Sequence, residues 1–147
     1  DRPGDRWSGQ MAFPGGHAEA QDASLAETAR RETMEEIGVS LAGAECLGEL
    51  SEVSIVPRRP AESAILSAFV FFAGSDEPLI KPNVEVAAAY WISIEHLWAP
   101  ENSTTVEWDA PGGMLTLPGI RYNDQVIWGL TYRVLESFSE AIGRSLP

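Results

Sequence analysis

The amino-acid sequence predicts an α/β protein, with α+β as the alternative class. Two segments carry apolar residues at the helical spacing of three and four positions, one before residue 38 and one near the C-terminus. Short runs rich in β-branched and aromatic residues lie between these segments, and turn-forming residues bound each run. Because strands and helices interleave along the chain, we expect a sheet packed between helices.

A short strand and a helix are the first elements expected. Gln10–Phe13 is an apolar run that ends at Pro14–Gly16, because proline and glycine break regular structure. Asp22 or Ser24 can cap the helix that follows, since both side chains accept hydrogen bonds from backbone N–H groups. This helix is expected to cover about Ser24–Ile37.

Two cap signals define the ends of this helix. Ser24 and Glu27 fit the S-x-x-E capping box, in which the serine side chain binds the backbone at the start of the helix. Gly38 follows the last helical position, where glycine commonly adopts a left-handed conformation. The helix is therefore expected to end at Ile37.

A long β-hairpin is expected next. Its strands would be Glu45–Val56 and Ser63–Ala73, and Pro57–Pro60 would separate them, because proline cannot join a central ladder. A further strand is expected at Ala88–Ile94. A short helical turn is expected at Glu95–Trp98.

The C-terminal part is expected to hold an irregular stretch, an edge strand and the last helix. The edge strand is expected near Gly113–Leu117, and Asp124 is expected to cap the helix. The apolar residues at helical spacing are Val126, Ile127, Leu130, Val134, Leu135, Phe138 and Ile142. Together they would give this helix one broad apolar face.

The chain is strongly acidic. Its 147 residues, a length that fits a single domain over 1–147, carry 22 acidic and 10 basic side chains, for a net charge of −12. This charge disfavours binding to nucleic acids or to an anionic membrane, and no apolar run is long enough to span a bilayer. The single Cys46, expected to be buried, excludes an internal disulfide. We expect a cytoplasmic protein, either a monomer or a homodimer.

Three glutamates share one side of the first helix. At about 100° per residue, Glu32, Glu35 and Glu36 point in similar directions. Like charges at this spacing cost roughly 0.2–0.5 kcal/mol per pair, unless a cation neutralises them. Oxygen ligands suit Mg²⁺ or Mn²⁺, and Arg31, four residues from both Glu27 and Glu35, can hold a carboxylate in place. The alternative is a solvated acidic helix face.

The segment Gly16–Val39 resembles the Nudix box, G-x5-E-x7-R-E-U-x-E-E-x-G-U with U aliphatic, of hydrolases that cleave nucleoside diphosphates linked to another moiety. Its second half matches at Arg31, Glu32, Glu35, Glu36, Gly38 and Val39. Thr33 replaces the aliphatic residue. In the first half, Gly16 is one residue further from Arg31 than in the box, and Asp22 stands in place of the first glutamate.

The sequence is similar to one branch of this family, the coenzyme A pyrophosphatase-like Nudix proteins. The branch patterns are G-Q-V-A-F-P-G-G, A-L-R-E-A-x-E-E-I-G, P-G-x-x-Y and I-W-G-x-T. The matching segments are Gly9–Gly16, Ala29–Gly38, Leu117–Tyr122 and Val126–Thr131. A further strand precedes the first pattern in this branch, so we expect an N-terminally truncated domain that lacks its first strand.

The resemblance implies a fold, a cofactor and a set of site residues. The fold would be an α/β/α sandwich with a mixed sheet between helices, and the cofactor Mg²⁺ or Mn²⁺. The implied metal ligands are Glu32, Glu35, Glu36 and the Gly16 carbonyl, with Glu36 as the central ligand. Glu32, Glu36 and Arg31 would form the catalytic part of the box, in which Arg31 holds a carboxylate and Glu32 can share the work of the base.

Residues outside the box complete the expected site. Nudix enzymes often take a general base from another loop, and Glu85 in Pro82–Val86 is the best candidate, with a plain surface residue as the alternative. Arg58 and Arg59 could bind a substrate phosphate or could simply keep an exposed turn soluble. Gly15 is the third expected substrate-binding residue.

Three functions remain open at this stage. The first is metal-dependent hydrolysis of coenzyme A or acyl-coenzyme A to adenosine 3′,5′-bisphosphate and 4′-phosphopantetheine. The second keeps the chemistry but takes ADP-ribose, a nucleotide sugar or a dinucleotide as the small-molecule nucleotide substrate. The third is a noncatalytic nucleotide-binding module, and the intact Glu32, Glu35 and Glu36 argue against it.

Overall fold

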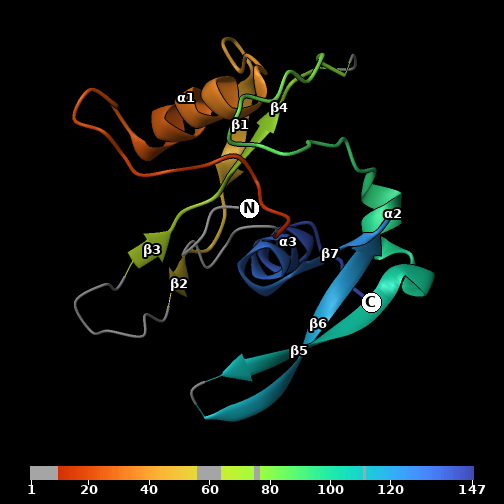
Figure 1. The fold of residues 1–147 in the computed structure, drawn as a ribbon. Coiled ribbons are helices and arrows are strands. Elements are labelled where there is room, and N and C mark those ends of the chain that lie inside the picture. The colour runs from red at the N-terminus through yellow and green to blue at the C-terminus, as the bar shows by residue number, and fades with distance from the viewer. Residues whose placement is uncertain (1–9, 56–63, 75–76, 111) are drawn as a thin grey trace. The chain divides into compact units, whose positions relative to one another are not determined.

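The fold is given by a computed structural model that describes residues 10–55, 64–74, 77–110 and 112–147 (Figure 1). The chain divides into two compact units, Pro14–Trp91 on the one hand and Asp1–Phe13 with Ile92–Pro147 on the other. Each unit combines helix and strand, which confirms the α/β class.

The first helix of the Pro14–Trp91 unit, α1 (Leu25–Ile37), begins and ends as its sequence predicts. The Ser24 side chain accepts a hydrogen bond from the Glu27 N–H at 3.2 Å, so Ser24 and not Asp22 is the N-cap. Gly38 has φ of 67°, and its N–H donates to the Met34 carbonyl at 3.1 Å. A left-handed residue costs little here because glycine has no Cβ.

The expected hairpin is present but interrupted. Its strands are β1 (Glu45–Glu49), β2 (Val53–Ile55), β3 (Ala64–Leu66) and β4 (Phe69–Phe72). β1 pairs with β4 and β2 with β3, both antiparallel, and the Leu50 N–H donates to the Ala68 carbonyl at 2.8 Å between the two ladders. The turn Pro57–Pro60 lies outside the described residues. Cys46, expected to be buried, is exposed on β1.

Two expected strands are wrong. Gln10–Phe13 and Ala88–Ile94 lie within the described part of the chain, and neither is a strand. The Met11 carbonyl accepts a hydrogen bond from the Thr131 side chain at 2.8 Å rather than from a neighbouring strand. At the other segment, the Ser93 side chain accepts from the His96 N–H and starts a helix at Ile94. A side-chain bond therefore takes the place of strand pairing in each segment, a distant one at Met11 and a local one at Ser93.

The second unit contains a short helical region, a sheet and the last helix. Its elements are α2 (Ile94–Trp98), η2 (Pro100–Asn102), β5 (Ser103–Ala110), β6 (Gly113–Tyr122), β7 (Gln125–Trp128) and α3 (Gly129–Ala141). α2 confirms the helical turn expected at Glu95–Trp98. The three strands form an antiparallel sheet in the order β5-β6-β7, with Asn123 at φ of 53° in the tight turn that joins β6 to β7.

Three sequence expectations for this unit need correction. The segment Gly113–Leu117 is the first half of a longer strand, β6; it pairs with β5, which forms from the stretch expected to be irregular, while β7 pairs only with the second half of β6 from Gly119 on. Val126 and Ile127 lie in β7, so Asp124 does not cap the last helix. The described strand pairs are all antiparallel and form three separate sheets, so the expected mixed sheet is absent from the described residues.

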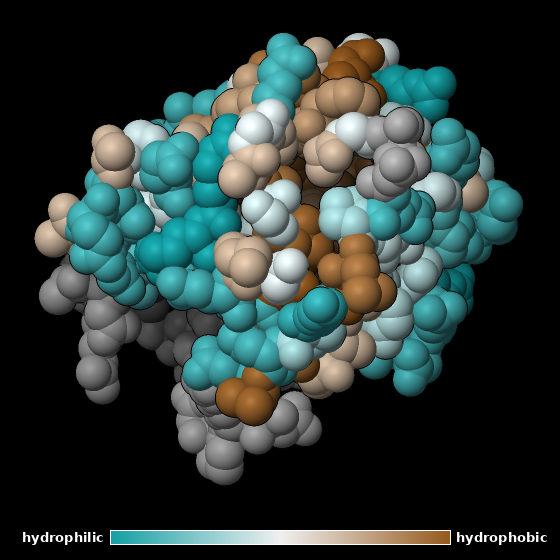
Figure 2. Space-filling model, turned by 90° about the horizontal axis from the view of Figure 1, so that it is seen from above, coloured by the Kyte–Doolittle hydropathy of each residue, from teal (hydrophilic) through white to brown (hydrophobic). Residues whose placement is uncertain are grey.

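The core of the second unit lies between its sheet and α3. Its buried residues are Leu97, Ile120, Ile127, Tyr132 and Leu135, with Met11, Ile92 and Leu146 packed against them. Apolar side chains also reach the surface of both units, and the face in Figure 2 shows brown hydrophobic residues among teal hydrophilic ones. In the described part of the chain, no helix combines the length and hydrophobicity that crossing a membrane requires.

Candidate functional site

Three segments of the Pro14–Trp91 unit meet at the C-terminal half of α1. The Gly15 N–H donates to Oε2 of Glu36 at 3.2 Å, which places the turn after Pro14 against the helix. The third segment is the loop around Asn83, whose N–H donates to the Glu36 carbonyl at 2.8 Å. Glu36 is thus the residue at which the helix, the glycine turn and the loop around Asn83 come together.

Arg31 organises the carboxylates on this side of α1. Its Nε and Nη2 atoms each donate to one oxygen of Asp22, at 3.0 Å in both cases. Nη1 donates to Oε1 of Glu32 at 2.8 Å and to Oε2 of Glu35 at 3.2 Å, and Nη2 also reaches the His17 carbonyl at 3.1 Å. Such charge-assisted, two-point contacts fix a side chain more firmly than a single bond.

The expectation that Arg31 holds a carboxylate is confirmed, and of the two glutamates four residues away it binds Glu35. Glu27 instead binds Nε of Arg30 at 3.2 Å. Arg31 turns toward Asp22, whose side chain is only 6% exposed and also accepts hydrogen bonds from the Thr28 hydroxyl and the Glu19 N–H. Arg31 therefore makes its two-point contact with Asp22, which is nearly buried and has further hydrogen-bond donors around it.

Hydrogen bonding shifts both members of the Asp22–Arg31 pair toward their charged forms. The Arg31 guanidinium, followed by the Glu19 N–H, holds the pKa of Asp22 well below its usual value. The Asp22 carboxylate in turn raises the pKa of Arg31 above its already high value. Both groups therefore stay ionised at neutral pH, and Arg31 keeps a full charge with which to bind Glu32.

Negative charge gathers around Glu36. Its pKa lies above the usual value, first because partial burial penalises the charged form. The carboxylates of Glu32, Glu85 and Glu35 act in the same direction, while the Gly15 N–H acts in the opposite one. The structure thus brings Glu85 from a separate loop close enough to Glu36 to influence its ionisation.

Gly16 allows the turn to approach the helix closely. A Cβ atom added at Gly16 would collide with the carboxylate of Glu32, whereas a Cβ atom at Gly15 would meet nothing within 4 Å. A larger residue at position 16 would therefore force the Glu32 carboxylate, the end of a flexible side chain, to move from its present place. The role of the Gly16 carbonyl as a metal ligand stays a prediction.

The donor atoms of this region suit a hard divalent cation. Glu32, Glu35 and Glu36 offer carboxylate oxygens, the ligands that Mg²⁺ and Mn²⁺ prefer. In the described residues, however, no three His, Cys, Asp or Glu side chains already form a group that could hold a metal ion. Glu32 and Glu35 bind Arg31, and Glu36 binds Gly15. The residues fit the ion by chemistry, and their present bonds are to protein groups.

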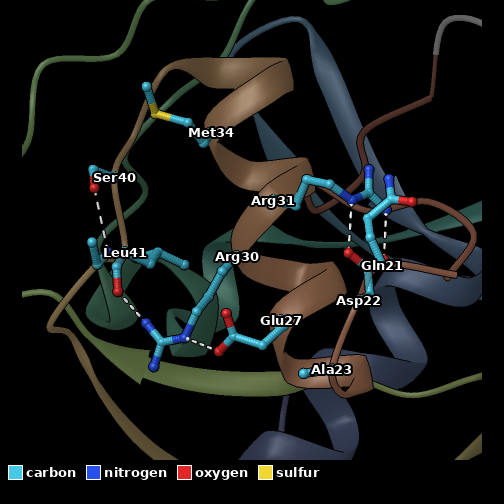
Figure 3. Close-up of a pocket in the computed structure, with 10 residues that line it drawn as sticks. Gln21, Asp22, Ala23, Glu27, Arg30, Arg31, Met34, Ser40 and Leu41 are labelled. Carbon is cyan, nitrogen blue, oxygen red and sulfur yellow. Dashed lines mark hydrogen bonds and ion pairs between the residues drawn. The ribbon is translucent and has the colours of Figure 1, made fainter. Parts of the chain in front are cut away.

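A pocket of about 400 Å³ lies on the same helix, and Figure 3 shows the residues around it. Arg30 and Arg31 both line it, yet both guanidinium groups are used within the protein. Arg30 binds the carbonyls of Leu41 and Ala44 and stacks over the Phe71 ring at 4.5 Å. The two arginines that line this pocket are therefore already bonded to protein groups.

The sequence-predicted residues are only partly brought together. Arg31, Glu32, Glu35, Glu36, Gly15 and Gly16 lie around α1, and Glu85 acts on Glu36 from its loop. Arg58 and Arg59 lie outside the described residues. Asp22 and Asn83 were not predicted as site residues. The signals for them were an acid near the missing first glutamate of the box and a Pro-Asn turn pair before Glu85.

Comparison with known proteins adds a family match. The family model described as NUDIX domain matches residues 1–112. The chain is 38% identical over 112 residues to an uncharacterized protein of Schizosaccharomyces pombe, a match that covers 74% of this chain and 34% of that protein. It is 28% identical over 145 residues to the uncharacterized Nudix hydrolase NudL of Yersinia enterocolitica, covering 92% of this chain and 67% of the relative.

A second relative of the same name gives a similar result. The chain is 26% identical over 135 residues to NudL of Yersinia pestis, covering 92% of this chain and 65% of that protein. The chain thus spans about a third of the yeast relative and about two thirds of the bacterial relatives that it matches. The names of these relatives state no substrate.

Proposed function

The chain belongs to the Nudix family, and on that premise we propose that it is a metal-dependent hydrolase that cleaves the diphosphate bond of a nucleotide joined to another moiety. The observation that carries the proposal is the gathering of Glu32, Glu35 and Glu85 around Glu36 beside the glycine turn. Such a concentration of negative charge is costly unless a cation compensates it.

Mg²⁺ or Mn²⁺ would be held by Glu32, Glu35 and Glu36, with the Gly16 carbonyl as a further ligand. When bound, the ion neutralises phosphate charge and lowers the pKa of water. Arg31 would orient the metal ligands, because it already binds Glu32 and Glu35 while Asp22 fixes its own position.

Glu85 would act as the general base. The oxygen of the attacking water forms a bond to one phosphorus, the bridging P–O bond breaks, and Glu85 accepts the proton that the water releases. The Gly15 N–H, which donates to Oε2 of Glu36, would keep that carboxylate directed toward the turn. Substrate binding by Gly15, Arg58 and Arg59 belongs to the same proposal.

Coenzyme A or an acyl derivative is the proposed substrate. The supporting observation is the likeness of Gly9–Gly16, Ala29–Gly38, Leu117–Tyr122 and Val126–Thr131 to the coenzyme A pyrophosphatase-like branch. ADP-ribose, a nucleotide sugar or a dinucleotide is the second candidate. We also propose a cytoplasmic location. We further propose a single domain over 1–147, because the family match over 1–112 includes parts of both compact units.

The test is hydrolysis by the purified chain across a substrate panel with Mg²⁺, followed by chromatography of the products. We expect coenzyme A to give adenosine 3′,5′-bisphosphate and 4′-phosphopantetheine, and chelation of the metal to stop the reaction. Turnover of ADP-ribose without turnover of coenzyme A would replace the substrate but keep the chemistry. Nucleotide binding without hydrolysis of any diphosphate would instead indicate a noncatalytic module.

A further inference from the structure

The segment Lys81–Val86 caps the C-terminal end of α1. Lys81 donates its N–H to the Ile37 carbonyl at 2.8 Å, and Asn83 donates its N–H to the Glu36 carbonyl at 2.8 Å. The side chain of Asn83 adds a bond from Nδ2 to the Glu35 carbonyl at 3.0 Å. These carbonyls have no partner inside the helix, because the last turn of an α-helix leaves its C=O groups free. The segment therefore satisfies three of them.

The contact between this segment and the helix end is close. A Cβ atom added at Gly38 would lie 3.0 Å from Cβ of Lys81 and 3.1 Å from its carbonyl oxygen. Glycine at this position thus serves two purposes, the left-handed cap and the approach of the loop.

The carboxamide of Asn83 connects the helix to the backbone of Glu85. While Nδ2 binds the helix, Oδ1 accepts hydrogen bonds from the N–H groups of Glu85 at 2.8 Å and Val86 at 3.2 Å. One short side chain thus uses a donor toward the Glu35 carbonyl and an acceptor toward the loop. Of the standard side chains this short, only asparagine carries both a planar amide donor and a carbonyl acceptor.

We propose that Asn83 is a positioning residue, which holds the backbone of Glu85 to the end of α1 and so keeps the Glu85 carboxylate beside Glu36. The inference rests on the proposed function for the role of Glu85 as general base. The Asn83 side chain forms these hydrogen bonds with backbone groups of Glu35, Glu85 and Val86, and not with their side chains. It acts through Glu85.

A purely structural role for Asn83 makes a different prediction. If the residue only caps α1, its loss weakens the helix end and lowers activity to the same extent whether or not Glu85 is present. If Asn83 acts through Glu85, its loss has no further effect once the Glu85 carboxylate is gone. A double-mutant cycle separates the two cases, because coupled residues give non-additive effects.

The first measurement is amide hydrogen exchange in the whole chain. In Asn83→Ala, exchange of the Glu85 and Val86 amides should become about tenfold faster, because their acceptor is removed. In Asn83→Asp, which keeps the Oδ1 acceptor, both amides should stay protected. The Leu50 amide, bonded to Ala68 elsewhere in the same unit, serves as the internal control. Unchanged exchange at Glu85 and Val86 in folded Asn83→Ala would overturn the inference.

The second measurement is the cycle of Asn83→Ala and Glu85→Gln, read as kcat and KM at saturating Mg²⁺. We expect Asn83→Ala to lower kcat between about tenfold and a hundredfold with little change in KM, since a misplaced group slows the chemical step. In the Glu85→Gln background the same substitution should leave kcat unchanged. Where Asn83→Ala does not fold, Asn83→Ser, with a weaker acceptor, takes its place in both measurements.

The outcomes distinguish this inference from the proposed function. Equal losses of kcat in both backgrounds, or full activity in Glu85→Gln, overturn the inference while diphosphate hydrolysis stands. If the wild-type chain hydrolyses no diphosphate in the panel, the proposed function falls. In that case Asn83 cannot position a general base. The amide exchange rates still decide whether Asn83 holds the loop.

Discussion

Asp22 and Arg31 face each other through two parallel hydrogen bonds, from Nε to Oδ1 and from Nη2 to Oδ2, each 3.0 Å long. The same guanidinium binds Glu32 and Glu35 through Nη1. Asp22 therefore fixes the guanidinium that holds two of the candidate metal ligands. Replacing Asp22 should therefore lower both the free energy of unfolding and the rate of hydrolysis.

The pH dependence of stability should report the Asp22–Arg31 pair. The pKa of Asp22 in the folded chain is lower than in the unfolded chain, where an aspartate titrates near about 3.9. The stabilisation is thus present above about pH 4 and is lost as the pH falls below that value. Urea unfolding from pH 6 to pH 2 should show a smaller loss of stability in Asp22→Asn than in wild type. Parallel curves would contradict the prediction.

Glu36→Gln should abolish most of the diphosphate hydrolysis. The substitution keeps the size of the side chain and an oxygen acceptor for the Gly15 N–H but removes the charge at the centre of the carboxylate group. We expect kcat to fall on the order of a hundredfold to a thousandfold, as when one group that stabilises the transition state is removed. Steady-state kinetics with Mg²⁺ checks this.

Glu27→Gln is the matched control for Glu36→Gln. Glu27 lies on the same helix but pairs with Arg30 and does not bind Arg31 through any contact described above. Its substitution should leave kcat within about twofold of wild type, as expected for a surface change away from the site. Full activity in Glu36→Gln, with or without an effect of Glu27→Gln, would refute the site assignment.

Arg30 should matter for stability and not for catalysis. It binds the Leu41 and Ala44 carbonyls, pairs with Glu27 and stacks over Phe71, and so ties α1 to the turn before β1 and to β4. Arg30→Met should lower the free energy of unfolding by about 1–3 kcal/mol, since the Ala44 carbonyl loses the Arg30 donor and the Leu41 carbonyl keeps only the Ala44 N–H. Chemical denaturation checks this prediction.

The control for Arg30→Met is Arg133→Met, at an exposed position on α3. This change should stay within about 0.5 kcal/mol of wild type. At temperatures where both variants are folded, both should keep the wild-type kcat. A large fall in kcat for folded Arg30→Met would place Arg30 in the site and contradict the structural role assigned to it.

The elements with local signals were predictable from the sequence. α1 begins after Ser24 and ends before Gly38 because both caps act within one helical turn. The last helix was extended too far, since Val126 and Ile127 also fit helical spacing. Their place in β7 depends on pairing with β6, and Gly129, with φ of 64°, then turns the chain into the helix. Whether a segment pairs as a strand depends on its partner strand as well as on its own residues.

The site follows the same division between local and distant contacts. The bond of Arg31 to Glu35 follows from their spacing on one helix, and the sequence predicted it. The bonds of Arg31 to Asp22 and of Asn83 to Glu35 join residues from a loop to a helix, 9 and 48 positions apart. Such contacts depend on how the loops fold back, which no periodicity reveals.

Gly16→Ala should disturb the site through space alone. The new methyl group would collide with the Glu32 carboxylate, so either the turn or the glutamate must move. Because the clash is with the end of a flexible side chain, the free energy of unfolding should change by only about 0.5 kcal/mol, whereas the displaced carboxylate should weaken Mg²⁺-dependent activity. Gly48→Ala is the matched control, because a Cβ atom there meets nothing within 4 Å. Thermal unfolding and titration of activity with Mg²⁺ measure both effects. Wild-type stability and metal dependence in Gly16→Ala would show that the turn can withdraw from Glu32 without cost.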